Sequence, residues 1–309
     1  MTKRPFAQVD VFTATPYYGN PLAVVLNGAD VSNEAMQRFA RWTNLSETTF
    51  VLPPTPEGAA KGADYRVRIF TPDSELPFAG HPTLGTCHAW LQAGGVPQRT
   101  DCIVQECGVG LVQIRRKGSR LAFAAPPLQR RAVDAAELAP ILAALKIEAH
   151  QVIAAQHLHN GPHWLGLLLD HPDTVLALEP DHQALQNYEV KVGVAGIYTA
   201  QAASNLIARA NREARAFEIQ TTQLEVRAFA APLGVNEDPV TGSLNASLAQ
   251  WLIADAYLPE TYTAAQGCCL GRSGIIYLQR DASRQVWVGG DVVTCVEGRV
   301  VIETTQTVP

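Results

Sequence analysis

The chain lacks the sequence features that mark membrane, secreted and disulfide-stabilised proteins. Its longest purely apolar runs are far shorter than the roughly 20 residues that a membrane-spanning helix needs. Residues 1–10 contain Lys3 and Arg4 but no apolar segment of the signal-peptide type. The six cysteines include no C-x-x-C pair, and a chain of 309 residues does not need disulfides to fold. We therefore expect a cytoplasmic protein with no membrane partner.

A strong excess of charge of one sign is also absent. Lys and Arg total 24, Asp and Glu total 29, and the net charge at pH 7 is −5. The basic runs Arg115–Lys117 and Arg130–Arg131 are short, whereas a nucleic-acid footprint needs a broad basic surface. We interpret these runs as solvated surface and expect no nucleic-acid partner.

The common cofactor and metal motifs are missing as well. The sequence has no G-x-S-x-G, Walker A or H-E-x-x-H motif, and Gly108-Val109-Gly110 lacks the third glycine of a dinucleotide fingerprint. His157, His159 and His163 have a weak metal-ligand spacing with no nearby Cys or Glu. A polar loop before a strand at 164–169 is the interpretation that we prefer for them. The sequence therefore predicts no metal and no cofactor.

What the sequence does contain is a strand-rich pattern with few helices. Tyr65, Val67 and Ile69 alternate with arginines, which is typical of a half-buried strand. Ser32 can cap a helix over 33–42, and an Ala- and Leu-rich segment predicts another helix over 135–146. Further strands are predicted at 9–12, 22–26, 50–52, 111–114, 224–229, 274–278 and 286–288, with a closing hairpin formed by 292–296 and 300–303.

The length and one proline pair predict two domains. A chain of 309 residues suits two domains of ordinary size, and Pro126-Pro127 marks the expected crossing, because neither proline can sit inside a strand ladder. We predict a first domain of residues 1–125 plus 289–309 and a second of residues 126–288. Aligned without gaps on Trp90-Leu91 and Trp251-Leu252, two segments of the chain each read as a strand, a turn and a helix. This suggests that the same structural element occurs in both domains.

Two segments, 77–83 and 236–243, place an acid–base side chain at a turn of small residues before an apolar run. His81 follows Gly80 in the first segment, and Asp238 precedes Pro239 in the second. The runs at 84–91 and 244–252 predict helices, whose first turns present unpaired N–H groups and the positive end of the dipole. Such helix starts suit a substrate carboxylate and favour a neutral imidazole at His81. Asp238 could instead be an N-cap or an Asx-turn residue.

Glu47 lies in a third segment, after the first predicted helix and before an apolar strand. On its own, a carboxylate at such an edge is usually a solvated turn residue. Beside two sites that need a proton shuttle, a glutamate with a raised pKa could take a proton from carbon and return it elsewhere.

Several motifs, taken together and in order, resemble the phenazine-biosynthesis PhzF family. They are GNPLAVV at 19–25, LSETTF at 45–50, RIFTP at 68–72, ELPFAGHPTLG at 75–85, EDPVTGS at 237–243, and Gln266-Gly267 with Gly271-Arg272. The last motif continues as Ser273-Gly274 rather than the family's usual Pro-Ser. The resemblance implies a diaminopimelate-epimerase-like α+β fold. In that fold two similar domains, each a strand-rich open barrel wrapped around a central helix, have the active site between them. It also implies a homodimer and no cofactor.

The resemblance also implies roles for particular residues. Glu47 matches the family's general acid/base glutamate, and His81 and Asp238 match its partners, which hold and polarise an amino-carboxylate substrate. The residues that we expect to bind substrate are Asn20, Ser46, Gly80, Gly242 and Ser243. Other enzymes of this fold use a cysteine pair as acid and base. No cysteine occupies either glycine-rich turn here, so we do not expect a two-thiol racemase.

The leading hypothesis is a cofactor-independent isomerase of a small amino- or hydroxy-carboxylate. In it Glu47 moves a proton from one carbon to another, as the phenazine enzyme of the family does with trans-2,3-dihydro-3-hydroxyanthranilate. One alternative is an amino-acid epimerase that uses Glu47 and Asp238 on opposite faces of the substrate. The other is a metabolite- or protein-binding module without turnover.

Overall fold

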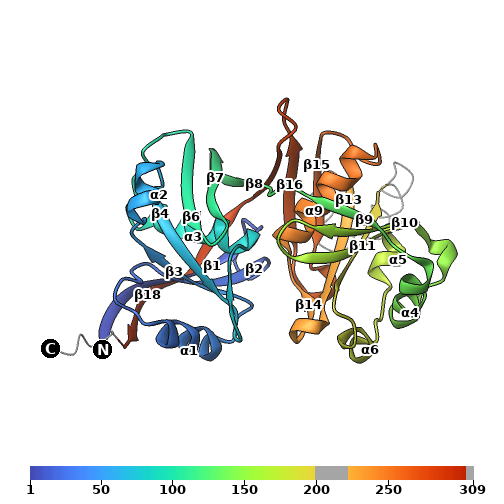
Figure 1. The fold of residues 1–309 in the computed structure, drawn as a ribbon, viewed down its shortest axis with the longest axis horizontal. Helices are drawn as coiled ribbons and strands as arrows, with labels where there is room; N and C mark the ends of the chain where they lie inside the picture. The colour runs from blue at the N-terminus through green and yellow to red at the C-terminus, as the bar shows by residue number, and fades with distance from the viewer. Residues whose placement is uncertain (199–221, 304–309) are drawn as a thin grey trace. The chain divides into compact units, whose positions relative to one another are not determined.

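The computed structural model describes residues 1–198 and 222–303. The chain divides into two compact units, Met1–Ala124 with Gly289–Pro309 (unit 1) and Ala125–Val288 (unit 2). Each unit combines many strands with a few helices, so the fold is α+β, as the sequence predicts (Figure 1).

Unit 1 begins and ends with long strands that pair with each other. Its elements are β1 (Thr2–Val11), β2 (Asn20–Val25), α1 (Asn33–Thr43), β3 (Thr48–Leu52), α2 (Pro56–Ala60), β4 (Tyr65–Phe70), β5 (Glu75–Leu76), α3 (Gly80–Gln92), β6 (Cys102–Cys107), β7 (Gly110–Lys117), β8 (Arg120–Ala124) and β18 (Val292–Ile302).

Unit 2 follows a similar course, and its last strand, β17, crosses the boundary to unit 1. Its elements are β9 (Gln129–Ala132), α4 (Ala135–Leu145), η1 (Ala149–Gln151), β10 (Val152–His159), β11 (His163–Leu169), α5 (Pro172–Leu176), α6 (His182–Gln186), β12 (Lys191–Ile197), β13 (Leu224–Ala230), η2 (Ala231–Leu233), β14 (Val235–Asp238), α9 (Gly242–Ala254), β15 (Thr261–Gln266), η3 (Cys268–Leu270), β16 (Gly274–Arg280) and β17 (Val286–Gly290).

The two units repeat one pattern of strand pairing. In unit 1, β1–β2 is antiparallel, β2–β3 parallel and β3–β4 antiparallel. Strand β4 then pairs antiparallel with the short β5 and parallel with β6, which pairs antiparallel with β7. In unit 2, strands β10 to β16 pair in the same order and the same directions, with β14 in the place of β5. The pairing pattern therefore confirms the predicted similarity of the two domains.

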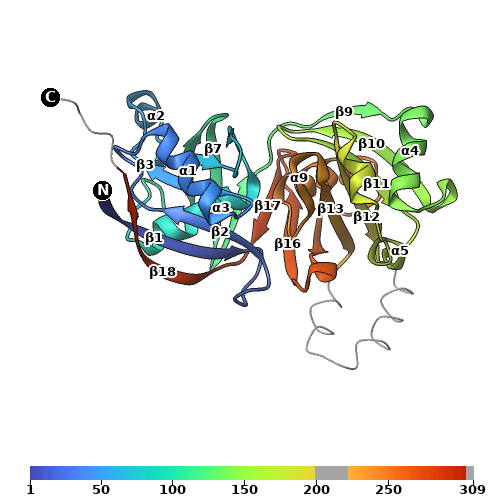
Figure 2. The same ribbon diagram turned by 90° about the horizontal axis from the view of Figure 1, so that it is seen from below.

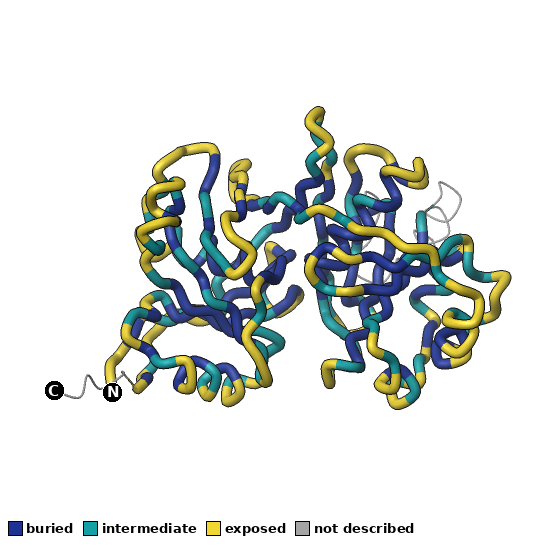
Figure 3. The backbone as a smooth tube through the Cα atoms, viewed as in Figure 1, coloured by how far each residue is buried: buried dark blue, intermediate teal, exposed yellow. Residues whose placement is uncertain are grey.

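Each unit buries one helix nearly all round, as the apolar runs predict. The 13-residue helix α3 packs against β1, β2, β3, β6, β8 and β18, and the 13-residue α9 packs against β10 and β16 (Figure 2). Glycine permits these close approaches. A Cβ atom at Gly85 of α3 would lie 2.6 Å from Leu22 Cδ2, and one at Gly193 of β12 would overlap the side chain of Leu244 in α9. Buried residues accordingly gather inside each unit (Figure 3).

The predicted gapless alignment of the two helices is off by one residue. It pairs Gly80 with Thr241, whereas Gly80 and Gly242 each begin a helix. Trp90 and Trp251, which anchored the alignment, therefore occupy different positions along their helices. The corrected register makes His81 and Ser243 equivalent, because each is the second residue of its helix.

The predicted closing hairpin at 292–303 is wrong. Strand β18 is continuous and pairs antiparallel with β1 from one end to the other, with Gly298 opposite Phe6. Gly298 is not among the glycines with positive φ, so it continues the strand. The long partner strand β1 supplies the hydrogen bonds that a local turn would otherwise have supplied.

The two amphipathic helices lie where the sequence predicts them. Ser32 Oγ accepts a hydrogen bond of 3.2 Å from Ala35 N at the start of α1, and Ile141 and Leu145 of α4 are buried. No helix within residues 1–198 and 222–303 is long and apolar enough to cross a membrane.

Candidate active site

The first group of predicted residues lies in unit 1, where β2, β3 and α3 begin. Asn20 begins β2, Ser46 and Glu47 directly precede β3, and His81 is in the first turn of α3. Asn44, which ends α1 in the left-handed conformation (φ 54°), turns the chain toward Ser46 and Glu47. We call Asn20, Ser46, Glu47, Gly80 and His81 half-site 1.

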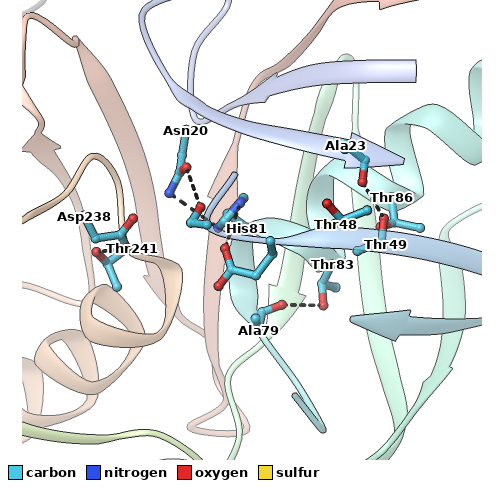
Figure 4. A network of polar contacts seen from close by, with 12 residues as sticks. Asn20, Ala23, Thr48, Thr49, Ala79, His81, Thr83, Thr86, Asp238 and Thr241 are labelled. Atoms are coloured by element: carbon cyan, nitrogen blue, oxygen red, sulfur yellow. Dashed lines mark hydrogen bonds and ion pairs between the residues drawn. The ribbon is translucent and has the colours of Figure 1, made fainter. Parts of the chain in front are cut away.

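Half-site 1 holds the imidazole of His81 between an amide and a carboxylate (Figure 4). His81 Nδ1 lies 3.4 Å from Asn20 Nδ2, and His81 Nε2 lies 3.5 Å from Glu47 Oε2. Ser46 Oγ donates to Asn20 Oδ1 at 3.4 Å. Asn20 and His81 are buried, and the Glu47 side chain is 16% exposed. Of these three side chains, that of Glu47 is thus the most open to a ligand.

These contacts set the tautomer of His81. An amide nitrogen can only donate, so Asn20 Nδ2 makes His81 Nδ1 an acceptor. The proton of the neutral ring is then on Nε2, which faces the carboxylate of Glu47. In this orientation of the amide, Asn20 Oδ1 accepts from Ser46 Oγ.

A buried chain of hydrogen bonds holds the start of α3 on the sheet. Tyr65 OH donates to Gln105 Oε1, and Gln105 Nε2 donates to Thr83 Oγ1. Thr83 Oγ1 in turn donates to Ala79 O (Figure 4). Thr86 Oγ1 also donates to Thr49 Oγ1 of β3 at 2.8 Å. His81 therefore stands on a helix whose first turn has little freedom to move.

The second group lies in unit 2, at the turn from β14 to α9. Asp238 ends β14, and its Oδ2 accepts a hydrogen bond of 2.5 Å from Thr241 Oγ1. Asp238 is not the N-cap of α9, because Thr241 has that position. We call Asp238, Thr241, Gly242, Ser243 and Gln266 half-site 2.

Gln266, in β15, forms hydrogen bonds with several residues of this turn. Its Oε1 accepts from Thr241 N (3.0 Å) and Asn245 Nδ2 (2.9 Å), and its Nε2 donates to Asp238 O (3.0 Å) and Thr241 Oγ1 (2.9 Å). Gln266 is 2% exposed. Gln105 on the equivalent strand of unit 1 likewise bonds a threonine at a helix start, so both units use a buried glutamine for the same purpose.

The starts of α3 and α9 suit an anion. Neither the Ala79 nor the Thr241 side chain caps the first turn of its helix. The first N–H groups of an α-helix have no partner within the helix, and the positive end of the dipole lies there. Both helix starts can therefore donate backbone hydrogen bonds to carboxylate oxygens.

The structure thus gathers the predicted residues into two groups, Asn20, Ser46, Glu47, Gly80 and His81 in unit 1 and Asp238, Gly242 and Ser243 in unit 2. Thr241 and Gln266 of half-site 2 were not predicted from the sequence, although both lie inside the family-like motifs. Asn160 and Trp164, which contact Ser243, were not predicted either. Only their place at the end of a polar loop could have indicated them.

His157, Cys87, Cys268 and Cys269 are not members of either group. His157 Nε2 is 3.1 Å from Glu137 Oε2, and the described residues contain no group of three or more His, Cys, Asp or Glu side chains that could hold a metal ion. Burial raises the pKa of the Cys87 thiol to about 12, so this residue of α3 is protonated at neutral pH. Cys268 and Cys269 lie in η3 rather than at either helix start.

Comparison with known proteins relates the whole chain to a described family. The family model "Phenazine biosynthesis-like protein" (PhzC-PhzF) matches residues 9–298. Antisense-enhancing sequence 1 of Schizosaccharomyces pombe is 34% identical over 97% of this chain and 99% of its own length. Trans-2,3-dihydro-3-hydroxyanthranilate isomerase of Pseudomonas aeruginosa is 33% identical over 95% of this chain and 98% of its own length.

Solved structures show the fold. A PhzF-family phenazine biosynthesis protein of Bacillus anthracis has a TM-score of 0.77 at 21% identity, covering 98% of this chain and 100% of its own. A probable proline racemase of Agrobacterium radiobacter K84 has a TM-score of 0.59 at 13% identity, covering 98% and 94%. These likenesses confirm the predicted epimerase-like fold. Because the family model matches nearly the whole chain, the chain belongs to the phenazine biosynthesis-like protein family.

Proposed function

We propose that the chain is an isomerase of a small amino- or hydroxy-carboxylate that works by proton transfer through Glu47. The observation that carries the proposal is the contact between Glu47 Oε2 and His81 Nε2 at 3.5 Å. The other ring nitrogen of His81 is in contact with Asn20. A carboxylate that is mostly removed from water and faces a positioned imidazole can accept a proton from carbon and return it.

In the proposed reaction the Glu47 carboxylate takes a proton from one substrate carbon and delivers it to another, so that one C–H bond breaks and one forms. The Nε2–H of His81 donates a hydrogen bond to a substrate heteroatom or to Glu47. Backbone N–H groups at the starts of α3 and α9 bind carboxylate oxygens. We propose further that Asp238 and Ser243 act on the same substrate molecule, with Asp238 exchanging a proton with a heteroatom.

The substrate candidate is trans-2,3-dihydro-3-hydroxyanthranilate, after the Pseudomonas aeruginosa relative of that name. The choice is open to test, because the fission yeast relative with a different name has almost the same identity. The cytoplasmic location and the homodimer expected from the sequence belong to the proposal as well. Light scattering of the purified protein would test the homodimer.

The decisive experiment is proton NMR in D₂O with trans-2,3-dihydro-3-hydroxyanthranilate and then a panel of small amino acids. Wild type is compared with Glu47→Gln, Asp238→Asn and, as a control, Glu57→Gln, which changes an exposed glutamate of unit 1. A positioned acid/base group is worth about 10²- to 10⁴-fold in rate, so Glu47→Gln loses about that factor while Glu57→Gln retains activity.

The product distinguishes the alternatives. A double-bond shift supports the isomerase, whereas deuterium incorporation with inversion and no shift supports an epimerase. An unchanged rate in Glu47→Gln would refute the role of Glu47. Ligand-induced thermal stabilisation without any proton exchange would support a binding module.

A further inference from the structure

Ser243 receives a hydrogen bond from a buried tryptophan. Trp164 of β11 is 2% exposed, and its Nε1 lies 3.3 Å from Ser243 Oγ in the first turn of α9. An indole N–H can donate but cannot accept, so the serine oxygen is the acceptor in this pair. The hydroxyl hydrogen of Ser243 must therefore point away from Trp164. The described residues offer no acceptor for it.

A cation lies over the same tryptophan. Lys191 of β12 is paired in register with Trp164, and its Nζ lies 4.4 Å from the centre of the indole ring. A positive charge over the ring face is attracted by the π electrons and withdraws them from the N–H. Hydrogen bonds in a chain polarise one another, so a stronger indole donor makes the serine hydroxyl a stronger donor in turn.

Asn160 provides a second, independent observation that indicates a ligand site beside Ser243. Its Nδ2 donates to Ser243 O at 3.2 Å, and the residue is 3% exposed. Its Oδ1 is buried without a hydrogen-bond partner among the described residues. An unpartnered buried acceptor is costly, so one beside a helix start is expected to be satisfied by a bound N–H or O–H group. An amino- or hydroxy-carboxylate carries such a donor next to its anion.

We propose that Trp164 is a positioning residue that makes Ser243 a dedicated hydrogen-bond donor to the carboxylate of an amino- or hydroxy-carboxylate ligand. Lys191 strengthens the effect through the indole ring. That this ligand is the substrate rests on the proposed function; that the subsite binds a carboxylate does not. Trp164 acts only through Ser243, and this makes the idea testable by a double-mutant cycle.

The test is calorimetric titration with anthranilate and with anthranilamide, which replaces the carboxylate by a neutral amide. The proteins are wild type, Trp164→Phe, Ser243→Ala and the double variant. Trp164→Phe keeps an aromatic ring but loses the N–H. One hydrogen bond to a charged group is worth about 10- to 150-fold in affinity. Because the indole acts on the ligand only through Ser243, we expect Trp164→Phe to weaken anthranilate binding by about three- to tenfold. Binding of anthranilamide should be unchanged.

In the Ser243→Ala background, Trp164→Phe should cause no further loss, and Lys191→Met should weaken anthranilate binding only while Trp164 is present. Trp251→Phe is the matched control, because Trp251 is also buried and donates from Nε1 to Asp255 Oδ2 near the other end of α9. It should leave the preference for anthranilate unchanged.

The inference is overturned if wild type binds anthranilate no better than anthranilamide. Additive losses in the double variant would overturn it too, as would an equal weakening of both ligands by Trp164→Phe. Binding is measured without turnover, so this result is separate from the fate of the proposed isomerase. If wild type has no isomerase activity but still prefers anthranilate, the proposed subsite stands and the proposed reaction is wrong.

Discussion

The guanidinium of Arg227 forms a buried bidentate ion pair with the carboxylate of Glu237, the residue directly before Asp238. Arg227 Nε and Nη2 donate to the two oxygens of Glu237 at 3.0 and 2.9 Å, and Nη1 donates to Val175 O and Leu178 O. Burial alone would lower the pKa of Arg227, but the hydrogen bonds and charge of Glu237 outweigh it and raise this pKa. Successive residues of a strand point to opposite faces, so the pair fixes the direction of Asp238.

Glu237→Gln should therefore destabilise the protein by about 3–5 kcal/mol, because it leaves a buried guanidinium without its countercharge. Urea unfolding measures the loss. Glu260→Gln is the control, since Glu260 pairs with Arg280 but its side chain is 59% exposed. Exposed pairs are worth about 0–1 kcal/mol. Equal losses in the two variants would contradict the importance of burial here.

Gln266→Glu tests the scaffold of half-site 2. The change keeps the oxygen that accepts from Thr241 N and Asn245 Nδ2 but turns the donor that faces Asp238 O and Thr241 Oγ1 into an acceptor. A buried group left unsatisfied costs about 1–3 kcal/mol, and we expect a similar loss of stability with kcat/KM falling by about tenfold. Gln250→Glu makes the same chemical change where the amide donates to Pro126 O at a partly exposed place, and should have a smaller effect. If it lowers kcat/KM as much as Gln266→Glu, the scaffold argument fails.

The tautomer of His81 can be read directly. Long-range ¹H–¹⁵N correlation spectra should show a proton on Nε2 and none on Nδ1, because Asn20 Nδ2 donates to Nδ1. Asn20→Asp replaces this donor by an acceptor and should move the proton to Nδ1. His88, whose Nε2 lies 2.9 Å from Thr294 Oγ1, should keep its spectrum in the variant. A wild-type His81 with its proton on Nδ1 would show that the Asn20 amide is oriented the other way.

The sequence predicts the elements of half-site 1 well because its signals are local. Glycine and proline beside His81 mark a helix start, and apolar residues mark the run that follows. What could not be predicted depends on pairing between distant strands. The β18 partner of β1 is nearly three hundred residues away, so a glycine that continues a strand resembled a turn. The hydrogen bonds from Gln266 to Thr241 and from Trp164 to Ser243 likewise depend on which strands lie beside α9.

Cysteine alkylation tests the exclusion of thiol chemistry. In the native protein at pH 8, iodoacetamide should leave Cys87 unmodified, because the thiolate is the reactive form and burial raises the pKa of this thiol to about 12. Cys269 is exposed and should be alkylated first. Mass spectrometry locates the label, and isomerase activity should survive labelling of Cys269. Activity lost in step with that labelling would reopen a cysteine mechanism.

Acid stability should depend on Glu137, which lies in the first turn of α4. The hydrogen bonds from His157 and then from Arg131 lower the pKa of Glu137 to about 2. A carboxyl whose pKa is lower in the folded state stabilises the fold above its unfolded pKa, near 4.5, and loses this effect as the pH falls toward 2. Glu137→Gln should therefore lower Tm at pH 7 and make Tm fall less steeply than in wild type between pH 4.5 and 2. Gln is chosen because it can keep the capping box with Asp134. Glu148→Gln, in an exposed pair with His150, is the control and should follow the wild-type curve. A Glu137→Gln curve parallel to wild type would mean that the contact with His157 does not hold the charged carboxylate in solution.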